Sequence, residues 1–179
     1  MVLDFQGLDL DMNLLEGEGR VHSELHLHVE IYRRRPEVHS IAHVHPFYSI
    51  LLSSVFKGKI HVLSQHGVHF AGKIPFHQSA ELVTSKKLGE KLARILGDRP
   101  VVVMKNHGIT VVGKSIEEAV ILSMHFEKAA KDHLLATTFG KPSGIPVAMA
   151  KKLSVNNYNP AQVKMMWDYY CKKFDRKES

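Results

Sequence analysis

Two apolar runs that flank a short polar turn restrict the fold of this sequence more than any other segment. Residues 100–105 read "PVVVMK" and residues 109–113 read "ITVVG", with "NHG" between them. Short runs rich in valine and isoleucine predict buried strands, and a tight turn joins strands that run antiparallel. The sequence therefore predicts a buried hairpin in the core.

Segments with helical patterns alternate with further strands along the chain. The clearest helix opens with Ser115 and Glu118 as a capping box and closes at Gly140. Strands are expected at residues 39–45 and, as short pieces, at 60–63 and 68–70. The expected helices cover residues 46–57, 81–96, 115–139 and 160–174. This alternation predicts an α/β or α+β protein.

The composition is that of one globular domain spanning residues 1–179. The content of 44% hydrophobic and 23% charged residues is ordinary for a folded protein. No apolar run reaches the roughly 18 residues of a membrane span, and the first residues do not resemble a signal peptide. The single cysteine, Cys171, suits a reducing compartment. We therefore expect a cytoplasmic protein that does not associate with membranes.

The positive charge does not indicate a nucleic-acid binder. The formal net charge is +6, from 24 basic and 18 acidic residues, and the basic residues are scattered along the chain. A nucleic-acid interface would more often show one basic stripe with interleaved aromatic residues, or a known motif. Scattered basic residues favour solvated lysines and binding of anionic small molecules instead.

Histidine is the unusual component, with 13 residues, and the pattern His-x-His occurs at 26–28 and again at 43–45. On a strand, residues i and i+2 point to the same side about 7 Å apart, so two imidazoles can converge on one ion. On a helix they diverge. Residues 39–45 are expected as a strand, whereas residues 25–35 fit both strand alternation and one helical face. Periodicity alone does not decide whether residues 25–35 form a strand or a helix.

A third histidine is a candidate to complete a metal site with His43 and His45. Catalytic zinc usually takes three protein ligands from histidines and carboxylates and leaves one position open. His107 lies at a tight turn beside a buried strand, where a purely structural histidine has little reason to be. A strand histidine is nevertheless more often a packed or surface residue, and His-x-His alone is a weak motif. Gly108 alone is typical of a turn.

Four motifs follow one another along the chain, Ser-Glu at residues 23–24, Arg-Pro-Glu-Val at 35–38, His-x-His at 43–45 and Asn-His-Gly at 106–108. Together they resemble the class II aldolase/adducin family, whose best-known members are fuculose-phosphate aldolase and ribulose-phosphate 4-epimerase. The family pattern is a Ser-Glu pair that opens a helix, an Arg-Pro-Asp/Glu-Val turn, a strand that ends in His-x-His, and a later Asn-His-Gly. This chain supplies them in that order at residues 23–24, 35–38, 43–45 and 106–108. The order and the spacing make the match specific.

The resemblance implies a fold and a metal site. The implied fold is an α/β arrangement, an α+β sandwich whose central, largely antiparallel sheet is flanked by helices, and it makes residues 25–35 a helix. The implied ligands are His43, His45 and His107, holding zinc or another divalent metal such as Mn²⁺. Glu24 is implied as the catalytic acid/base, although a glutamate in a first helical turn is otherwise ordinary.

The reaction implied by the resemblance is carbon–carbon bond cleavage. The expected enzyme is a lyase, most simply an aldolase of carbohydrate metabolism that cleaves a small sugar phosphate or related hydroxy-carbonyl compound through a metal-stabilised enediolate. Family members are commonly homotetramers, so a homo-oligomer is expected here.

The chain departs from the family aldolases at their phosphate site. Those enzymes carry an additional N-terminal segment with Gly-Asn-x-Ser and Thr-Pro-Ser-Gly turns that bind the substrate phosphate, and neither turn is present here. Where the aldolases have Ser-Ser-Glu, this chain has His22, Ser23 and Glu24, so His22 and Ser23 are expected at substrate-binding positions.

Two alternatives therefore stay open. Family decarboxylases of hydroxy or aromatic acids often share a stretch like residues 28–33, "HVEIYR", and their reaction uses the same metal site. The other alternative is a non-catalytic, adducin-like oligomerisation module. Adducins have lost metal ligands, whereas this chain keeps them.

Overall fold

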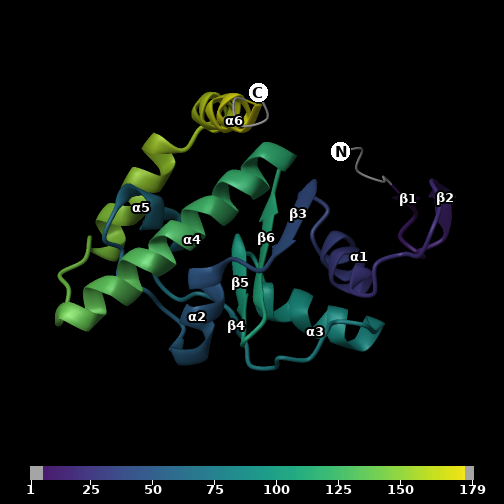
Figure 1. Ribbon diagram of the computed structural model, residues 1–179, viewed down its shortest axis with the longest axis horizontal. Helices are drawn as coiled ribbons and strands as arrows, with labels where there is room; N and C mark the ends of the chain where they lie inside the picture. The colour runs from purple at the N-terminus through teal and green to yellow at the C-terminus, as the bar shows by residue number, and fades with distance from the viewer. Residues whose placement is uncertain (1–5, 176–179) are drawn as a thin grey trace.

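A four-stranded sheet forms the middle layer of the molecule (Figure 1). The structure is a computed structural model that describes residues 6–175, apart from the side chains of residues 156, 157 and 175. One face of the sheet is covered by α2 (Phe47–Val55) and α4 (Ile116–Phe139), and the other face by α1 (Leu25–Arg34) and α3 (Lys86–Leu96). This arrangement confirms the expected sandwich of a sheet flanked by helices.

The sheet is largely antiparallel, as expected. Its strands, in spatial order, are β3 (Ser40–Val44), β6 (Gly108–Gly113), β5 (Val101–Met104) and β4 (Phe76–His77). The pairs β3–β6 and β6–β5 are antiparallel, and only the short β4 pairs with β5 in parallel. The predicted hairpin is therefore the pair β5–β6, every residue of which is buried.

Side chains of the hairpin alternate between two hydrophobic cores. Val101 and Val103 face the core formed with α2 and α4, where Leu52 and Phe126 also pack. Val102 and Met104 face the opposite core, and the residues from α1 and α3 that line it include Leu27, Ile31, Leu92 and Leu96. A strand with both faces covered reads as a continuous apolar run rather than an alternating one, which explains the valine-rich sequence.

Helix α1 settles the segment that periodicity left open. Residues 25–34 are helical, and Leu27 and Ile31 are fully buried against the sheet and α3. The two helices approach closely because α3 has a glycine at the contact. A Cβ atom on Gly89 would lie 2.5 Å from the His26 carbonyl oxygen. A side chain at that position would push α1 away from its place.

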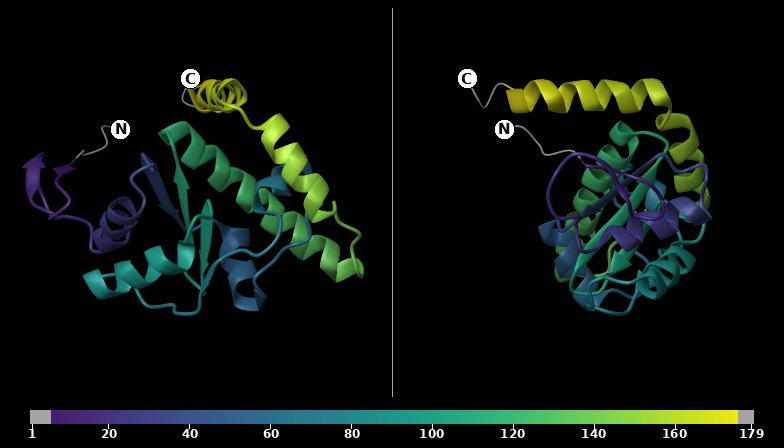
Figure 2. Two further views of the ribbon diagram at one scale, coloured as in Figure 1. Left: turned by 180° about the vertical axis from the view of Figure 1, so that it is seen from behind. Right: turned by 90° about the vertical axis from the view of Figure 1, so that its right-hand side faces the viewer.

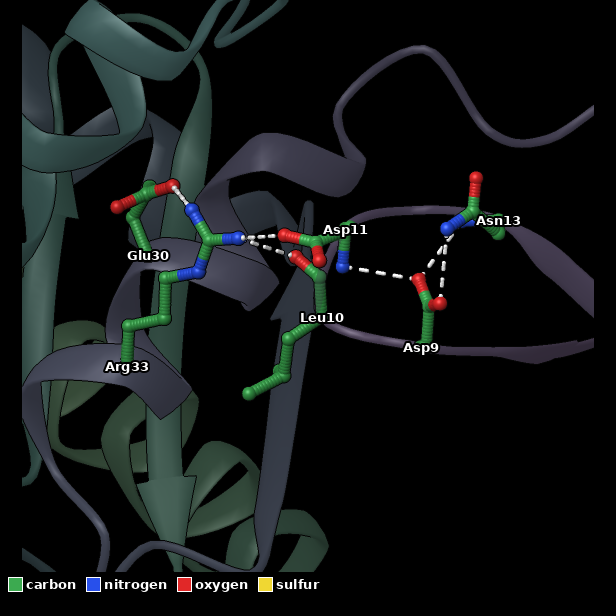
Figure 3. A network of polar contacts seen from close by, with 6 residues as sticks. All are labelled: Asp9, Leu10, Asp11, Asn13, Glu30 and Arg33. Atoms are coloured by element: carbon green, nitrogen blue, oxygen red, sulfur yellow. Dashed lines mark hydrogen bonds and ion pairs between the residues drawn. The ribbon is translucent and has the colours of Figure 1, made fainter.

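A small N-terminal hairpin is attached to α1 by one arginine (Figure 3). The hairpin consists of β1 (Gly7–Leu8) and β2 (Leu14–Glu16), outside the main sheet. Arg33 on α1 donates to the Leu10 carbonyl at 2.7 Å and to Asp11 Oδ1 at 2.6 Å, and also to Glu30 Oε1 at 3.0 Å. These contacts orient the segment that leads to residues 22–24.

The C-terminal third is helical. Helix α4 begins at the predicted capping box: Glu118 N–H donates to Ser115 Oγ, and Glu118 Oε2 accepts from the Lys114 N–H. It is followed by α5 (Val147–Asn157), which was not predicted, and by α6 (Pro160–Asp175), which was. Figure 2 shows α6 extending across the end of the body. Within residues 6–175, no helix combines the length and the apolar character needed to cross a bilayer.

Three local expectations were wrong. Residues 60–63 form no strand, and residues 65–70 form a 3-10 helix, η1 (Gln65–Phe70), instead of a strand. The helix expected from residue 81 begins at Lys86. The physical reason is that Ser85 Oγ caps it by accepting from Leu88 N–H, while the Val83 N–H before it donates to the Glu24 side chain.

Candidate metal centre

Four side chains from distant parts of the sequence meet at the end of β3. His43 lies on β3, and His45 follows the strand by one residue. His107 occupies the turn between β5 and β6, and Glu24 is the N-cap of α1. The structure therefore brings together the three histidines and the glutamate that the sequence singled out.

The donor atoms of the four side chains form a tight group. All four lie within 4.8 Å of one another. His43 Nε2 is 3.1 Å from His45 Nε2 and 3.4 Å from Glu24 Oε2, and His107 Nε2 is also 3.4 Å from Glu24 Oε2. Ligands bound at about 2.0–2.1 Å around a tetrahedral ion lie roughly 3.3 Å apart. The three separations of 3.1–3.4 Å are thus compatible with ligands around one metal ion.

The hydrogen bonding of the cluster also fits a cation. His107 is 9% exposed, and neither of its ring nitrogens has a hydrogen-bond partner within the described part of the chain. Buried polar atoms are nearly always paired, and an ion held between His107 Nε2 and the Glu24 carboxylate would satisfy that nitrogen. Three histidines and one carboxylate are ligands that zinc favours, and other divalent metals accept them.

Burial and neighbouring groups shift the pKa values of His43 and Glu24. Burial lowers the pKa of His43 to about 4, although the Glu24 charge opposes the shift. Burial raises the pKa of Glu24, but the hydrogen bond from the Val83 N–H and the neighbouring imidazoles of His107 and His43 outweigh it, so the net pKa lies below the usual value. At neutral pH, His43 is therefore neutral, as ligation requires, and Glu24 is ionised, as a base beside the ion must be.

Helix α2 lies on the face of the sheet opposite to α1 and supports the two segments that carry the histidines, the one after β3 and the turn between β5 and β6. Glu127 on α4 accepts hydrogen bonds from the Tyr48 and Ser49 N–H groups, each at 2.8 Å, at the N-terminus of α2 just after His45. Near the other end of α2, Ser53 Oγ accepts from the Asn106 N–H at 2.8 Å. Asn106 has a φ of 52°, so this bond stabilises the unusual turn that carries His107. Sequence reasoning missed Glu127 and Ser53, because no local motif marks contacts this distant.

Gly108 has a steric role that its expected function as a turn residue did not include. A Cβ atom there would lie 2.8 Å from His45 Cδ2 and would also collide with the Val44 carbonyl oxygen. The absence of a side chain at Gly108 lets the two ligand-bearing segments pack against each other.

The remaining sequence candidates lie at the edge of the cluster. His22 and Ser23 are exposed, and His22 Nδ1 accepts from the Glu24 N–H at 3.2 Å. His26 and His28 lie on α1, where their spacing makes the rings diverge, and neither belongs to the group of metal donors. Burial, together with the nearby His22, lowers the pKa of His28. Of the two His-x-His pairs, only the second contributes to the cluster.

Comparison with known proteins identifies the family. The family model described as "Class II Aldolase and Adducin N-terminal domain" matches residues 1–134. The chain belongs to the class II aldolase and adducin family. An L-fuculose phosphate aldolase of Methanocaldococcus jannaschii is 36% identical over 132 residues, which cover 74% of this chain and 70% of the aldolase. A 3,4-dihydroxyphthalate decarboxylase of Rhodococcus jostii is 29% identical over 136 residues, covering 70% of this chain.

The fold of a solved protein agrees with the fold of this chain. An L-fuculose 1-phosphate aldolase from Glaciozyma antarctica superposes with a TM-score of 0.82 at 21% identity, over 98% of this chain and 69% of the other. The chain spans 54% of the length of the Rhodococcus decarboxylase, about half of that enzyme. The relatives thus include enzymes named as aldolases of a sugar phosphate and as decarboxylases of an aromatic acid.

Proposed function

We propose that this protein is a divalent-metal-dependent carbon–carbon lyase, and specifically an aldolase that cleaves a small sugar phosphate or a related hydroxy-carbonyl compound. The observation that carries the proposal is the convergence of Glu24, His43, His45 and His107 on one point at the spacing of metal ligands. Zinc is the metal that this donor set favours.

The chain's own residues have distinct roles in this proposal. His43, His45 and His107 would hold the ion, which supplies stabilisation of the negative charge that develops on a substrate oxygen. Glu24 would accept and return the proton, since its carboxylate is buried, ionised and beside the histidines. His45 is exposed, so the open side of the cluster faces solvent, where substrate can approach. His22 and Ser23, at the edge of the cluster, would contact the substrate.

Metal analysis of four proteins tests the site. We expect the wild type to bind zinc stoichiometrically, and His43→Ala and His107→Ala to lose most of it. His39→Ala is the matched control, because His39 is an exposed histidine just before β3 and outside the cluster. Undiminished zinc in both cluster variants would contradict the assignment. A wild type without affinity for zinc would favour the non-catalytic, adducin-like module.

Decarboxylation on the same site is the second candidate. It is supported by the relatives that are decarboxylases and by His22, which stands where the family aldolases carry a hydroxyl. The two reactions give different products. With L-fuculose 1-phosphate and 3,4-dihydroxyphthalate as probes, release of an aldehyde supports the aldolase, whereas release of carbon dioxide without an aldehyde supports the decarboxylase.

The expected homotetramer also belongs to the proposal. Phe47, Leu51 and Val55 recur every four residues on α2 and are 70%, 46% and 62% exposed. An apolar stripe of this kind on a surface helix supports association with another subunit. Because α2 begins beside His45, such an interface would adjoin the cluster. A cytoplasmic location stays a prediction.

A further inference from the structure

The second ring nitrogen of His43 has a buried partner that the proposed function does not use. His43 Nδ1 lies 3.1 Å from Thr110 Oγ1, and the two residues stand directly opposite each other on β3 and β6. Thr110 is fully buried, and its hydroxyl donates to Met104 Sδ at 3.3 Å. We propose that Thr110 positions His43 for metal binding by holding its ring in the tautomer whose Nε2 carries the lone pair. This inference rests on the proposed metal site.

The proposal follows from the hydrogen inventory of a neutral imidazole, which has one N–H and one lone pair. Ligation through Nε2 puts the hydrogen on Nδ1, and that N–H needs an acceptor because the His43 side chain is only 6% exposed. Thr110 Oγ1 is placed to accept it, since its own hydrogen is directed to Met104. Nε2 then faces the other donors, His45 and Glu24.

The other two histidines lack such support. Both ring nitrogens of His107 are without a hydrogen bond in the described structure, and His45 is exposed. Within the described residues, His43 is therefore the one of the three histidines whose ring has a hydrogen-bond partner outside the cluster. Partners of this kind fix the ring of a metal-binding histidine and tune its basicity.

Loss of the hydroxyl should affect the metal-bound state more than the metal-free state. Without metal, the His43 hydrogen can move to Nε2, which lies 3.4 Å from the Glu24 carboxylate. With metal on Nε2 this shift is blocked, and the Nδ1–H is left buried without an acceptor. The penalty should therefore appear in metal affinity, while the metal-free protein keeps its stability.

Zinc affinity of Thr110 variants tests the inference. Thr110→Val keeps the shape and removes the hydroxyl, and we expect zinc binding, measured in competition with a chromogenic chelator, to weaken by about 10- to 100-fold. Thr110→Ser should restore it. Ser123→Ala is the matched control, because it removes a buried hydroxyl on α4 that donates to the Ala119 carbonyl and lies outside the cluster. The melting temperature of each metal-free variant should stay near that of the wild type.

Nitrogen-15 NMR of the histidine rings gives a second, independent measurement. In the zinc-loaded wild type, His43 should carry its hydrogen on Nδ1, and an Nε2–H form would overturn the inference even if Thr110→Val failed to fold. Wild-type zinc affinity in Thr110→Val, or equal losses in the valine and serine variants, would overturn the role of Thr110 and leave the metal site standing. A wild type that binds no zinc would overturn the site itself.

Discussion

Glu24 is the residue on which catalysis, as distinct from metal binding, depends in the proposed function. Its Oε1 accepts from the Val83 N–H at 2.9 Å, while its Oε2 faces His43 and His107. Glu24→Gln keeps an acceptor for Val83 and removes the base. We expect turnover of the substrate that the wild type cleaves to fall by roughly 10²- to 10⁴-fold, with zinc still held by the three histidines.

The matched control for this prediction is Glu30→Gln. Glu30 is a buried carboxylate on the same helix, 7% exposed, but it pairs with Arg33 away from the cluster. Glu30→Gln should keep its turnover. A Glu24→Gln variant with wild-type turnover would show that another group moves the proton.

Single residues differ in how far the sequence could reveal them. Strand geometry and a tight turn made His43, His45 and His107 candidates, and the family resemblance selected them as the ligand set. Glu24 was found only through the family resemblance, since a glutamate at a helix start is common. The place of Thr110 on a buried strand could be predicted once the hairpin was recognised. Its position opposite His43 could not, because that depends on the pairing of β3 with β6.

At the scale of elements, α2 links the two segments that carry the histidines, and Glu127 caps its start. The helix has no side-chain cap of its own, so the carboxylate of α4 supplies the acceptors. Glu127→Gln removes the charge and one acceptor oxygen. We expect the free energy of unfolding to fall by about 1–3 kcal/mol, measured by chemical denaturation of the metal-free protein.

The control for the α2 cap is Glu90→Gln, an exposed position on α3 whose side chain caps no helix. Its stability should stay close to that of the wild type. If Glu127→Gln were as stable as the wild type, the hydrogen bonds of the Glu127 carboxylate would contribute no more to stability than hydrogen bonds to water.

Elements with strong local signals were predicted well, and those defined by distant contacts were not. The helix α4 has a capping box and the hairpin β5–β6 has two apolar runs, and both were found. The two-residue β4 exists because it pairs with β5, and the start of α3 is set partly by Glu24. Such contacts join residues far apart in sequence, so no local pattern encodes them.

For the whole molecule, the layered architecture explains where the site lies. The strand β3 is at the edge of the sheet, and its last residues reach the N-terminus of α1 on one face. The opposite face is closed by α2 and α4, which fix the backbone around the ligands. The alternation of strands and helices predicted an α/β or α+β protein, and the family resemblance implied the sandwich.

Buried histidines outside the metal cluster should make the whole protein sensitive to acid. Burial lowers the pKa of His69 to about 4, and burial together with the nearby His66, His69 and Lys128 lowers the pKa of His125 to about 3. Both stay neutral in the folded state, whereas an unfolded chain binds protons below about pH 6.5. Stability should therefore be complete above that pH and decline toward pH 4, by up to about 1.4 kcal/mol per pH unit for each histidine.

Chemical denaturation at several pH values measures this slope, with a chelator present because metal affinity is itself pH-dependent. His125→Phe keeps a ring and replaces a nitrogen, Nδ1, that has no partner in the described structure. This variant should reduce the slope of the unfolding free energy against pH by up to about 1.4 kcal/mol per pH unit. That amount corresponds to one proton, because one histidine that is neutral in the folded state has been removed. His39→Ala removes an exposed histidine and should leave the slope unchanged. Equal slopes in the wild type and His125→Phe would mean that His125 is protonated alike in both states, and the acid sensitivity would then have to arise elsewhere.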